Sequence, residues 1–301
     1  MVDFESLEKE LRIRCPALEL RAEEPMSRHT SFRVGGPAAL MAFPKSEEEA
    51  TLAVETASEM GVTPFFIGNG SNLLVSDEGV RRFLIKTVPG LGSCRAERTS
   101  IVAGSGIPLA RLASFACEQG LTGLEFAHGI PGSLGGAVTM NAGAYGGEMA
   151  QVVQEVLCLT PTGAREWVTQ FSFGYRTSTF SDGQRMILQV RMELAPGDQE
   201  AIATQMASLA QQRQRKQPLE YPSAGSMFKR PVGHYAGALI EQCGLKGFSV
   251  GGAQVSEKHA GFVINRGGAT CRDILELVHQ VQQRVEAQTG VVLEMEVRVL
   301  S

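Results

Sequence analysis

The sequence predicts a protein of mixed α and β structure with more than one domain. Its 301 residues are enough for two or three domains, and a hydrophobic content of 43% can form substantial cores. Short apolar runs, typical of buried strands, alternate with amphipathic helical segments along most of the chain. One such run ends in a glycine-rich loop, and a second glycine-rich loop follows a helix. The pattern therefore favours an α/β or α+β class.

The first half of the chain predicts two units of strand and helix. Ser46 and Glu49 form a capping box that begins one helix, while Pro108 and Gly120 bracket another. We expect residues 30–87 to form a β-α-β unit. The expected elements are a helix over 4–13, a strand over 38–43, a helix from the Ser46 cap to about 60, a strand over 64–67, a polar connector over 90–98, a strand over 100–103 and a helix over 109–119.

The second half predicts strands followed by helices. Alternation along the last expected strand places Glu294, Glu296 and Arg298 on one face. The expected elements are strands over 152–160, 166–168 and 186–194, helices over 199–216 and 236–243, a strand over 260–265, a helix from a Thr270–Asp273 cap to 288, and a strand over 291–300. The domains are expected to span 1–88, 89–197 and 198–301, with the last strand able to return to the first part.

Two loops have a composition that suits ligand binding. Gly123–Gly147 combines many glycines with small and apolar residues, one glutamate and no lysine or arginine. Glycine lets the backbone approach another group closely, whereas loops that only connect elements use polar turn formers. Gly68-Asn69-Gly70-Ser71-Asn72 forms a second loop of this kind. Exposed N–H groups in two such loops indicate a large phosphate-bearing ligand, a dinucleotide, although either loop alone is consistent with a structural turn.

Composition and spacing disfavour several classes of function. Neither loop has the glycine spacing of a nicotinamide-type Rossmann fingerprint. A net charge of −4 and a pI near 5.8 provide no basic field for nucleic acid. The six cysteines include no CxxC pair and the five histidines have no metal-ligand spacing, so no metal site is expected. The first residues are charged and no apolar run is long enough to span a membrane, so we expect a cytoplasmic protein.

Six ordered motifs resemble the UDP-N-acetylenolpyruvoylglucosamine reductase family, and the similarity runs from about residue 25 to 300. The motifs are IGNGSNLLVSD, GIPGSLGGAVTMNAGAYGGEM, FGYRTS, PLEYPSAGSMFKRP, GGAQVSEKHAGFVIN and LEMEVRVL. The PLEYPSAGS segment and the short stretch between Arg176 and Ser226 are similar to the type II branch. The resemblance implies a two-domain FAD-binding fold of the vanillyl-alcohol oxidase type, followed by a C-terminal α+β domain that binds the substrate.

The resemblance also implies a reaction and its cofactors. Family members reduce UDP-N-acetylglucosamine enolpyruvate to UDP-N-acetylmuramate for peptidoglycan synthesis, with NADPH as hydride donor and non-covalent FAD as the carrier. The resemblance implies that Arg176 binds the substrate carboxylate and that Glu296 polarises the same carboxylate. It also implies that Ser226 donates a proton to the carbon next to that carboxylate. Glu296 is preferred to its neighbour Glu294 because it stands immediately before Val-Arg.

The remaining expected site residues form two sets. Substrate contacts are expected from Tyr175, Lys229, Gln254 and His259, although His259 fits a structural role equally well. His128 is interpreted as a loop-packing residue that does not attach the flavin covalently. FAD contacts are expected from Gly68, Asn69, Gly70, Ser71, Asn72, Gly132, Ser133, Gly135, Gly136, Asn141 and Gly143. We expect a monomer whose partners are NADPH and the sugar nucleotide, without nucleic acid or membrane.

Two alternative functions stay open at this point. One is another FAD-dependent oxidase or dehydrogenase of the vanillyl-alcohol oxidase type that acts on an alcohol. Ser226 and Glu296 argue against it, because alcohol oxidation needs neither a proton donor nor an enolate clamp. The other is a catalytically silent sugar-nucleotide-binding protein, whose sequence would be expected to lack one of the three catalytic groups.

Overall fold

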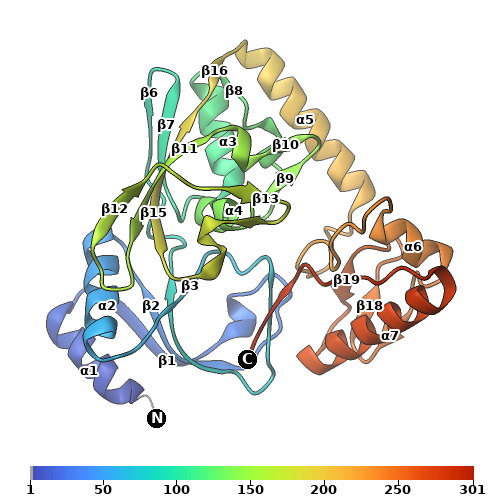
Figure 1. Cartoon of the computed structure of the whole chain (residues 1–301), viewed down its shortest axis with the longest axis horizontal. Helices are drawn as coiled ribbons and strands as arrows, with labels where there is room; N and C mark the ends of the chain where they lie inside the picture. Colours follow the sequence, from blue (N-terminus) through green and yellow to red (C-terminus); the bar gives the residue numbers. More distant parts are fainter. Residues whose placement is uncertain (1–2) are drawn as a thin grey trace. The chain divides into compact units, whose positions relative to one another are not determined.

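The computed structural model describes residues 3–301 (Figure 1). Contacts between residues divide the chain into two compact units. Unit 1 contains the residues up to 22 together with 39–69 and 82–211, and unit 2 contains 23–38, 70–81 and 212–301. Each unit is therefore assembled from separate stretches of the chain.

Two helices and a four-stranded sheet share one core. The sheet has the order β1-β2-β5-β3, formed by β1 (Glu19–Pro25), β2 (Pro37–Phe43), β5 (Val80–Lys86) and β3 (Phe65–Ile67). Helices α1 (Phe4–Arg14) and α2 (Glu47–Glu59) pack on each other, and their apolar faces join Leu40, Phe83 and Ile85 in the core. β3 pairs in parallel with β5, so Gly68 follows the end of a strand that is hydrogen-bonded inside a sheet.

A five-stranded antiparallel sheet forms the rest of unit 1. Its order is β12-β11-β15-β7-β6, with β12 (Arg165–Val168), β11 (Val153–Leu159), β15 (Met186–Glu193), β7 (Ser100–Gly104) and β6 (Cys94–Glu97). Helix α3 (Leu109–Glu118) buries Leu109, Leu112, Ala113 and Ala116, the spacing of one helical face. The short helix α4 (Leu134–Thr139) contacts α3 and the strands β7 and β15 (Figure 1).

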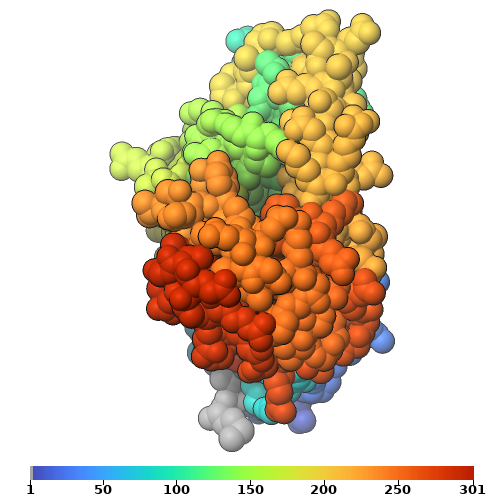
Figure 2. All heavy atoms as spheres, turned by 90° about the vertical axis from the view of Figure 1, so that its right-hand side faces the viewer, coloured from blue at the N-terminus to red at the C-terminus, as the bar shows by residue number. Residues whose placement is uncertain are grey.

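In unit 2, helices pack against a three-stranded sheet. The sheet has the order β17-β18-β19, formed by β17 (Ser249–Val250), β18 (Ala253–Val255) and β19 (Val263–Asn265). Helices α6 (Ala236–Gln242) and α7 (Cys271–Thr289) contact each other, and Figure 2 shows the closely packed surface of this part of the chain in orange and red. The last strand β20 (Arg298–Leu300) pairs in parallel with β4 (Leu73–Val75).

The remaining elements include a hairpin that carries two of the expected site residues. The hairpin β13 (Phe173–Gly174) and β14 (Thr177–Ser178) turns through Tyr175 and Arg176. The remaining elements are η1 (Met26–Arg28), β8 (Leu121–Thr122), η2 (Glu125–Ala127), β9 (Gly143–Ala144), β10 (Gly147–Glu148), η3 (Met149–Gln151), η4 (Thr179–Asp182), β16 (Ala195–Pro196) and α5 (Gln199–Lys216).

Most expected elements are present close to their predicted bounds. Thr270 and Asp273 cap each other, so this predicted capping box is confirmed. The Ser46 hydroxyl accepts the Glu49 N–H at 3.2 Å and caps its helix as predicted, but the Glu49 carboxylate accepts the Lys45 N–H at 2.7 Å, so the Ser46–Glu49 pair is not a reciprocal box. Helix α5 has the predicted bounds 199–216. Among residues 3–301, no helix is both long and apolar enough to cross a membrane.

Four expectations about elements are wrong. Residues 90–98 are not all connector, because Cys94–Glu97 form the edge strand β6, whose partly exposed side chains lack an apolar pattern. The expected strand over 291–300 is regular only at Arg298–Leu300, and the strand expected over 260–265 begins at Val263. The glycine-rich stretch 123–147 contains the helix α4, and strands β1, β17 and β18 were not predicted.

The N-terminus of α7 provides a test of this packing. The Asp77 carboxylate, from a distant stretch of unit 2, accepts the N–H groups of Cys271 at 2.7 Å and Arg272 at 3.0 Å. Because the N–H groups of the first turn lack partners within the helix, we expect Asp77→Ala to lower the free energy of unfolding by about 1–2 kcal/mol. Chemical denaturation followed by circular dichroism measures this, with Glu78→Ala as the neighbouring control. Equal losses in both variants would contradict the capping role.

Candidate functional site

The two glycine-rich loops meet within unit 1. A Cβ atom added to Gly68 would overlap the Ser133 hydroxyl, so the first loop approaches the second as closely as a backbone can. Ser133 precedes α4, where the N–H of Leu134 donates to the Ile107 carbonyl at 3.0 Å and the N–H of Leu109 donates to the Gly132 carbonyl at 3.1 Å. These bonds fix the second loop against the chain that joins β7 to α3.

Gly135 approaches the end of β7. Its N–H donates to the Ser105 carbonyl at 2.8 Å, and a Cβ atom at this position would lie 2.9 Å from the Ser105 Cβ. The protein itself therefore requires glycine here. Gly136 differs, because it is exposed and an added Cβ would come no closer than 3.8 Å to the Ser133 Oγ. The protein itself therefore leaves room for a small side chain at Gly136.

Two buried hydroxyl groups lie against these glycines without a hydrogen-bond partner among residues 3–301. Ser133 is 2% exposed and Ser105 is 1% exposed. A buried hydroxyl without a partner is unfavourable, so a group of this kind is suited to a ligand that binds close to the loop. The His128 Nδ1 atom, in the same stretch, is also buried without a partner.

The second loop also holds the hairpin that carries Arg176. Asn141, which is buried, donates its side-chain amide to the Gly174 carbonyl at 3.1 Å and accepts the Ala150 N–H at 3.0 Å. The Arg176 guanidinium donates to the Gly143 carbonyl at 3.2 Å and lies 5.2 Å from the centre of the exposed Tyr175 ring. The structure thus brings together four expected residues: Asn141, Gly143, Tyr175 and Arg176.

Arg176 has an unusual backbone conformation. Its φ is 54°, in the left-handed region that residues other than glycine seldom adopt. Such a conformation is unfavourable by itself and persists where surrounding contacts impose it. The hydrogen bond to Gly143 and the hairpin pairing of Phe173 with Ser178 supply those contacts here.

In unit 2, the end of the first loop lies beside Glu296. Gly70 has a φ of 61°, and a Cβ atom there would overlap the His29 carbonyl, so this glycine is required by the protein backbone. The Asn72 side-chain amide donates to the Glu296 carbonyl at 3.2 Å, and the Asn72 carbonyl accepts the Arg298 N–H at 3.0 Å. Asn72 therefore fixes the backbone on which Glu296 stands.

Ser226 and Glu296 lie on adjacent backbone segments. Ser226 pairs with Phe262 in an isolated β-bridge, and the next residue, Met227, donates its N–H to the Gly261 carbonyl at 2.8 Å. The Met227 carbonyl accepts the Glu296 N–H at 2.9 Å. A single residue, Met227, thus connects the segments of the two expected catalytic groups.

His259 supports the same backbone. Its Nδ1 atom accepts the Gly261 N–H at 3.1 Å, and a Cβ atom on Gly261 would lie 3.0 Å from the His259 ring and 3.4 Å from the Ser226 Oγ. Burial lowers the pKa of His259 below its ordinary value. The imidazole is therefore neutral at pH 7, with its proton on Nε2.

The other expected substrate residues have protein partners. The Lys229 ammonium forms an ion pair with Glu294, which is 71% exposed. Glu294, the neighbour to which the motif preferred Glu296, is therefore engaged in an ion pair at the surface. Gln254 donates to the Gly247 carbonyl at 3.1 Å and to the Ser249 hydroxyl at 3.0 Å, inside the β17–β18 hairpin.

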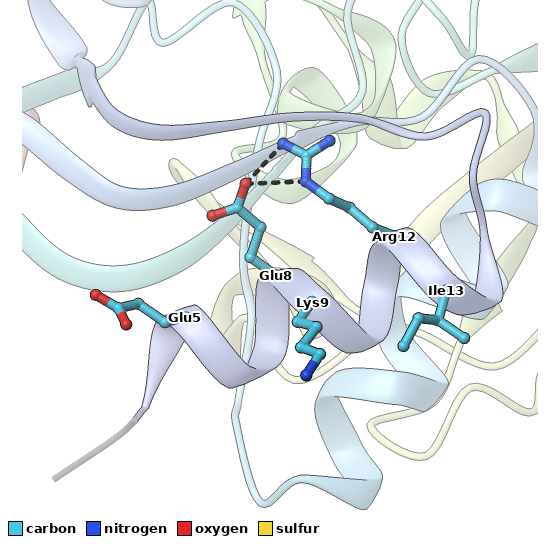
Figure 3. Close-up of a pocket in the computed structure, with 5 residues that line it drawn as sticks. All are labelled: Glu5, Glu8, Lys9, Arg12 and Ile13. Atoms are coloured by element: carbon cyan, nitrogen blue, oxygen red, sulfur yellow. Dashed lines mark hydrogen bonds and ion pairs between the residues drawn. The ribbon is translucent and has the colours of Figure 1, made fainter.

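Two surface hollows lie away from all of these residues. One, of about 400 Å³, runs along the exposed face of α1 (Figure 3) and is lined by Glu5, Glu8, Lys9, Arg12 and Ile13. There Arg12 and Glu8 form an ion pair within one helix. The other lies at the start of α7, where the Asp77 carboxylate already caps the helix. Residues 3–301 contain no group of histidine, cysteine, aspartate or glutamate that could hold a metal ion.

Sequence reasoning missed Ser105. It lies between Gly104 and Gly106 at the end of β7, a third glycine-rich segment that could have indicated it. The sequence signal for this segment was weak, because Gly104-Ser105-Gly106 is much shorter than the other two glycine-rich loops.

Comparison with known proteins agrees with the motifs. Residues 217–300 match the family described as UDP-N-acetylenolpyruvoylglucosamine reductase, C-terminal domain, and residues 38–169 match the family described as FAD binding domain. A UDP-N-acetylenolpyruvoylglucosamine reductase of Clostridium botulinum is 47% identical over 280 residues, 92% of this chain and 91% of the relative. One from Lactiplantibacillus plantarum is 45% identical over 287 residues, 95% of each chain.

A solved structure extends the likeness to the fold. The crystal structure of UDP-N-acetylenolpyruvylglucosamine reductase from Thermus caldophilus superposes with a TM-score of 0.82 at 36% identity, and covers 94% of this chain and 100% of that one. The expected combination of an FAD-binding part with a C-terminal reductase domain is thereby confirmed. On these relationships, the chain belongs to the UDP-N-acetylenolpyruvoylglucosamine reductase family.

Proposed function

We propose that this protein uses FAD and NADPH to reduce UDP-N-acetylglucosamine enolpyruvate to UDP-N-acetylmuramate, a step of peptidoglycan precursor synthesis. The observation that carries the proposal is the connection of Ser226 to Glu296 through Met227, within a family whose named relatives are reductases. A proton donor beside a carboxylate that interacts with an enolate is the arrangement that reduction of an enolpyruvyl group needs.

The residues of unit 1 fit a bound FAD. Closely packed glycines, the buried hydroxyl of Ser133 and the backbone N–H groups of the loop are suited to a large polar ligand. We propose that FAD is contacted by the residues that the motifs indicated, namely Gly68, Asn69, Gly70, Ser71, Asn72, Gly132, Ser133, Gly135, Gly136, Asn141 and Gly143. When bound and reduced by NADPH, FAD supplies the hydride.

Arg176 is proposed to bind the carboxylate of the enolpyruvyl group. Its planar guanidinium offers a fork of N–H donors that matches a carboxylate, whereas an ammonium group is a point charge. The Gly143 carbonyl accepts one of these N–H groups and helps to hold the side chain in place.

Ser226 and Glu296 are proposed to act at the carbon that becomes carbanion-like. Charge that develops there is spread onto the carboxylate, where Glu296 would stabilise it through a shared proton. Ser226 would donate the proton to carbon. A hydroxyl is a very weak acid in water, so it needs a fixed position and a strongly basic acceptor. The β-bridge to Phe262 and the hydrogen bond from Met227 to Gly261 provide that fixed position.

Several finer assignments belong to the same proposal. Tyr175, Lys229, Gln254 and His259 are proposed to lie on the substrate side, with His259 acting through the backbone of Gly261. We propose domain boundaries at 1–88, 89–197 and 198–301, non-covalent FAD, and a monomer. A cytoplasmic location is proposed because NADPH and nucleotide sugars are available there.

Ser226→Ala should separate the two halves of the reaction. Reduction of the flavin by NADPH needs no proton at the substrate carbon, so it should proceed near the normal rate. Reoxidation by the enolpyruvyl sugar nucleotide should slow by about 10²–10⁴-fold, the contribution of a positioned acid. Stopped-flow absorbance of the flavin measures both steps in one experiment.

Ser223→Ala is the matched control, because it removes a hydroxyl from the same turn. It should leave both half-reactions within about twofold of the original rates. If Ser226→Ala slows both halves equally, the serine shapes the pocket and another group donates the proton. If NADPH bleaches the flavin but the sugar nucleotide never restores it in the unaltered protein, the substrate assignment is wrong.

Gly136→Ala tests the cofactor cradle with little effect on the protein itself. The added methyl group meets open space, and alanine favours helix over glycine by about 1 kcal/mol. The flavin-free protein should therefore be at least as stable in thermal unfolding. We expect its affinity for FAD to fall by about tenfold or more, because the methyl group occupies the surface that the cofactor approaches. Unchanged affinity in a fluorescence titration with FAD would place the cofactor elsewhere.

A further inference from the structure

We propose that Ser105 is an additional cofactor-binding residue, whose hydroxyl donates a hydrogen bond to an oxygen or nitrogen acceptor of FAD. Ser105 is not part of either glycine-rich loop discussed above. It directly follows the strand β7, which ends at Gly104, and Gly106 comes next. The inference rests on the proposed function only in naming FAD as the ligand.

The backbone of Ser105 is fully used by the protein. Its N–H donates to the Leu188 carbonyl at 2.8 Å, and its carbonyl accepts the Gly135 N–H at 2.8 Å. The first bond joins Ser105 to the neighbouring strand β15, and the second holds the glycine-rich loop. With the backbone N–H and carbonyl both bonded, the side-chain hydroxyl is the one polar group of Ser105 that has no partner among residues 3–301.

Burial makes that missing partner costly. Ser105 is 1% exposed, so bulk water cannot satisfy the hydroxyl. Buried polar side chains in folded proteins are nearly always hydrogen-bonded, and an unpaired one lowers stability. Alanine would fill the same space without this loss. A serine at this position is therefore best explained by a partner outside the chain.

The surroundings identify what kind of partner fits. Ser105 contacts Gly135, a Cβ on Gly68 would reach Ser133, and a Cβ on Gly106 would overlap the Thr87 carbonyl. Ser133 and Thr87 are themselves buried hydroxyl residues, and the Thr87 hydroxyl donates a long hydrogen bond of 3.4 Å to the Ile67 carbonyl. Glycines and hydroxyls from three segments thus form one continuous wall, which we call the hydroxyl wall (Thr87, Ser105 and Ser133).

A wall of neutral hydroxyls offers hydrogen-bond donors to the acceptor atoms of a polar ligand. Hydroxyl groups can rotate to donate or accept, and they carry no charge that would require a counter-ion. Packed glycines allow a flat or extended ligand to lie directly on the backbone. The ring system and polyhydroxylated chain of a flavin dinucleotide offer such acceptors.

The experiment measures FAD binding to the flavin-free protein and needs no turnover. Ser105→Ala is compared with Thr56→Val, since Thr56 on α2 is a fully buried hydroxyl that also lacks a partner but lies in a different core. We expect Ser105→Ala to raise the dissociation constant of FAD by about five- to tenfold, the worth of one hydrogen bond. Thr56→Val should leave the dissociation constant within about twofold.

Thermal unfolding provides the second measurement. Without FAD, Ser105→Ala should unfold at the same temperature as the original protein or higher, because an unpaired buried hydroxyl has been removed. The rise in unfolding temperature that saturating FAD produces should be smaller than in the original protein. Ser105→Cys, which keeps the shape of the side chain with a weaker donor, should fall between the two.

The outcomes separate this inference from the proposed function. Ser105→Ala with unchanged FAD affinity would overturn the inference while the proposed function stands. Equal destabilisation with and without FAD would show that the hydroxyl binds a structural water and would also overturn it. Failure of the original protein to bind FAD would refute the proposed cofactor itself.

Discussion

The contact between glycine-rich loops and strand ends is the constraint on which unit 1 depends. Gly68 lies against the Ser133 hydroxyl, and Gly135 lies against the Ser105 Cβ, so a side chain at either glycine would have to displace a neighbouring group. Because the protein is closely packed at these glycines, a larger residue there would disturb the fold. Its effect on ligand binding could not then be measured separately. The same close packing places three buried hydroxyls together. Under the proposed assignment, stability and cofactor binding share one set of residues.

Sequence reasoning was most accurate where local physical signals are strong. Capping residues at Ser46 and Thr270 and the periodic apolar face of α3 predicted helices with nearly correct bounds. It failed where pairing with a distant strand decides the structure. Strand β6 has no apolar pattern of its own, and it is a strand because β7 supplies its hydrogen-bond partners. The segment before β20 is irregular because Met295 forms only a single bridge, to Phe228.

The same distinction applies to the candidate site. Family motifs assigned Arg176, Ser226 and Glu296 by position, whereas the ion pair between Glu294 and Lys229 joins residues far apart in the sequence and could not be predicted from spacing. Nor could spacing show that His259 supports Gly261 or that Asn72 holds the Glu296 backbone. Ser105 escaped notice because its importance comes from an unpaired hydroxyl, which only tertiary structure reveals.

The discontinuous composition of unit 2 has a consequence for its synthesis on the ribosome. Its core combines Phe32, Val34 and Leu74 with side chains from residues 224–297, and β20 pairs with β4, more than two hundred residues earlier. The early stretches must therefore wait, without their partners, until almost the entire chain has been made. A fragment that begins near residue 212 would lack Phe32, Val34 and Leu74 from its core. It would also lack β4, the strand with which β20 pairs. This unit is consequently a product of the whole chain and not a separable module.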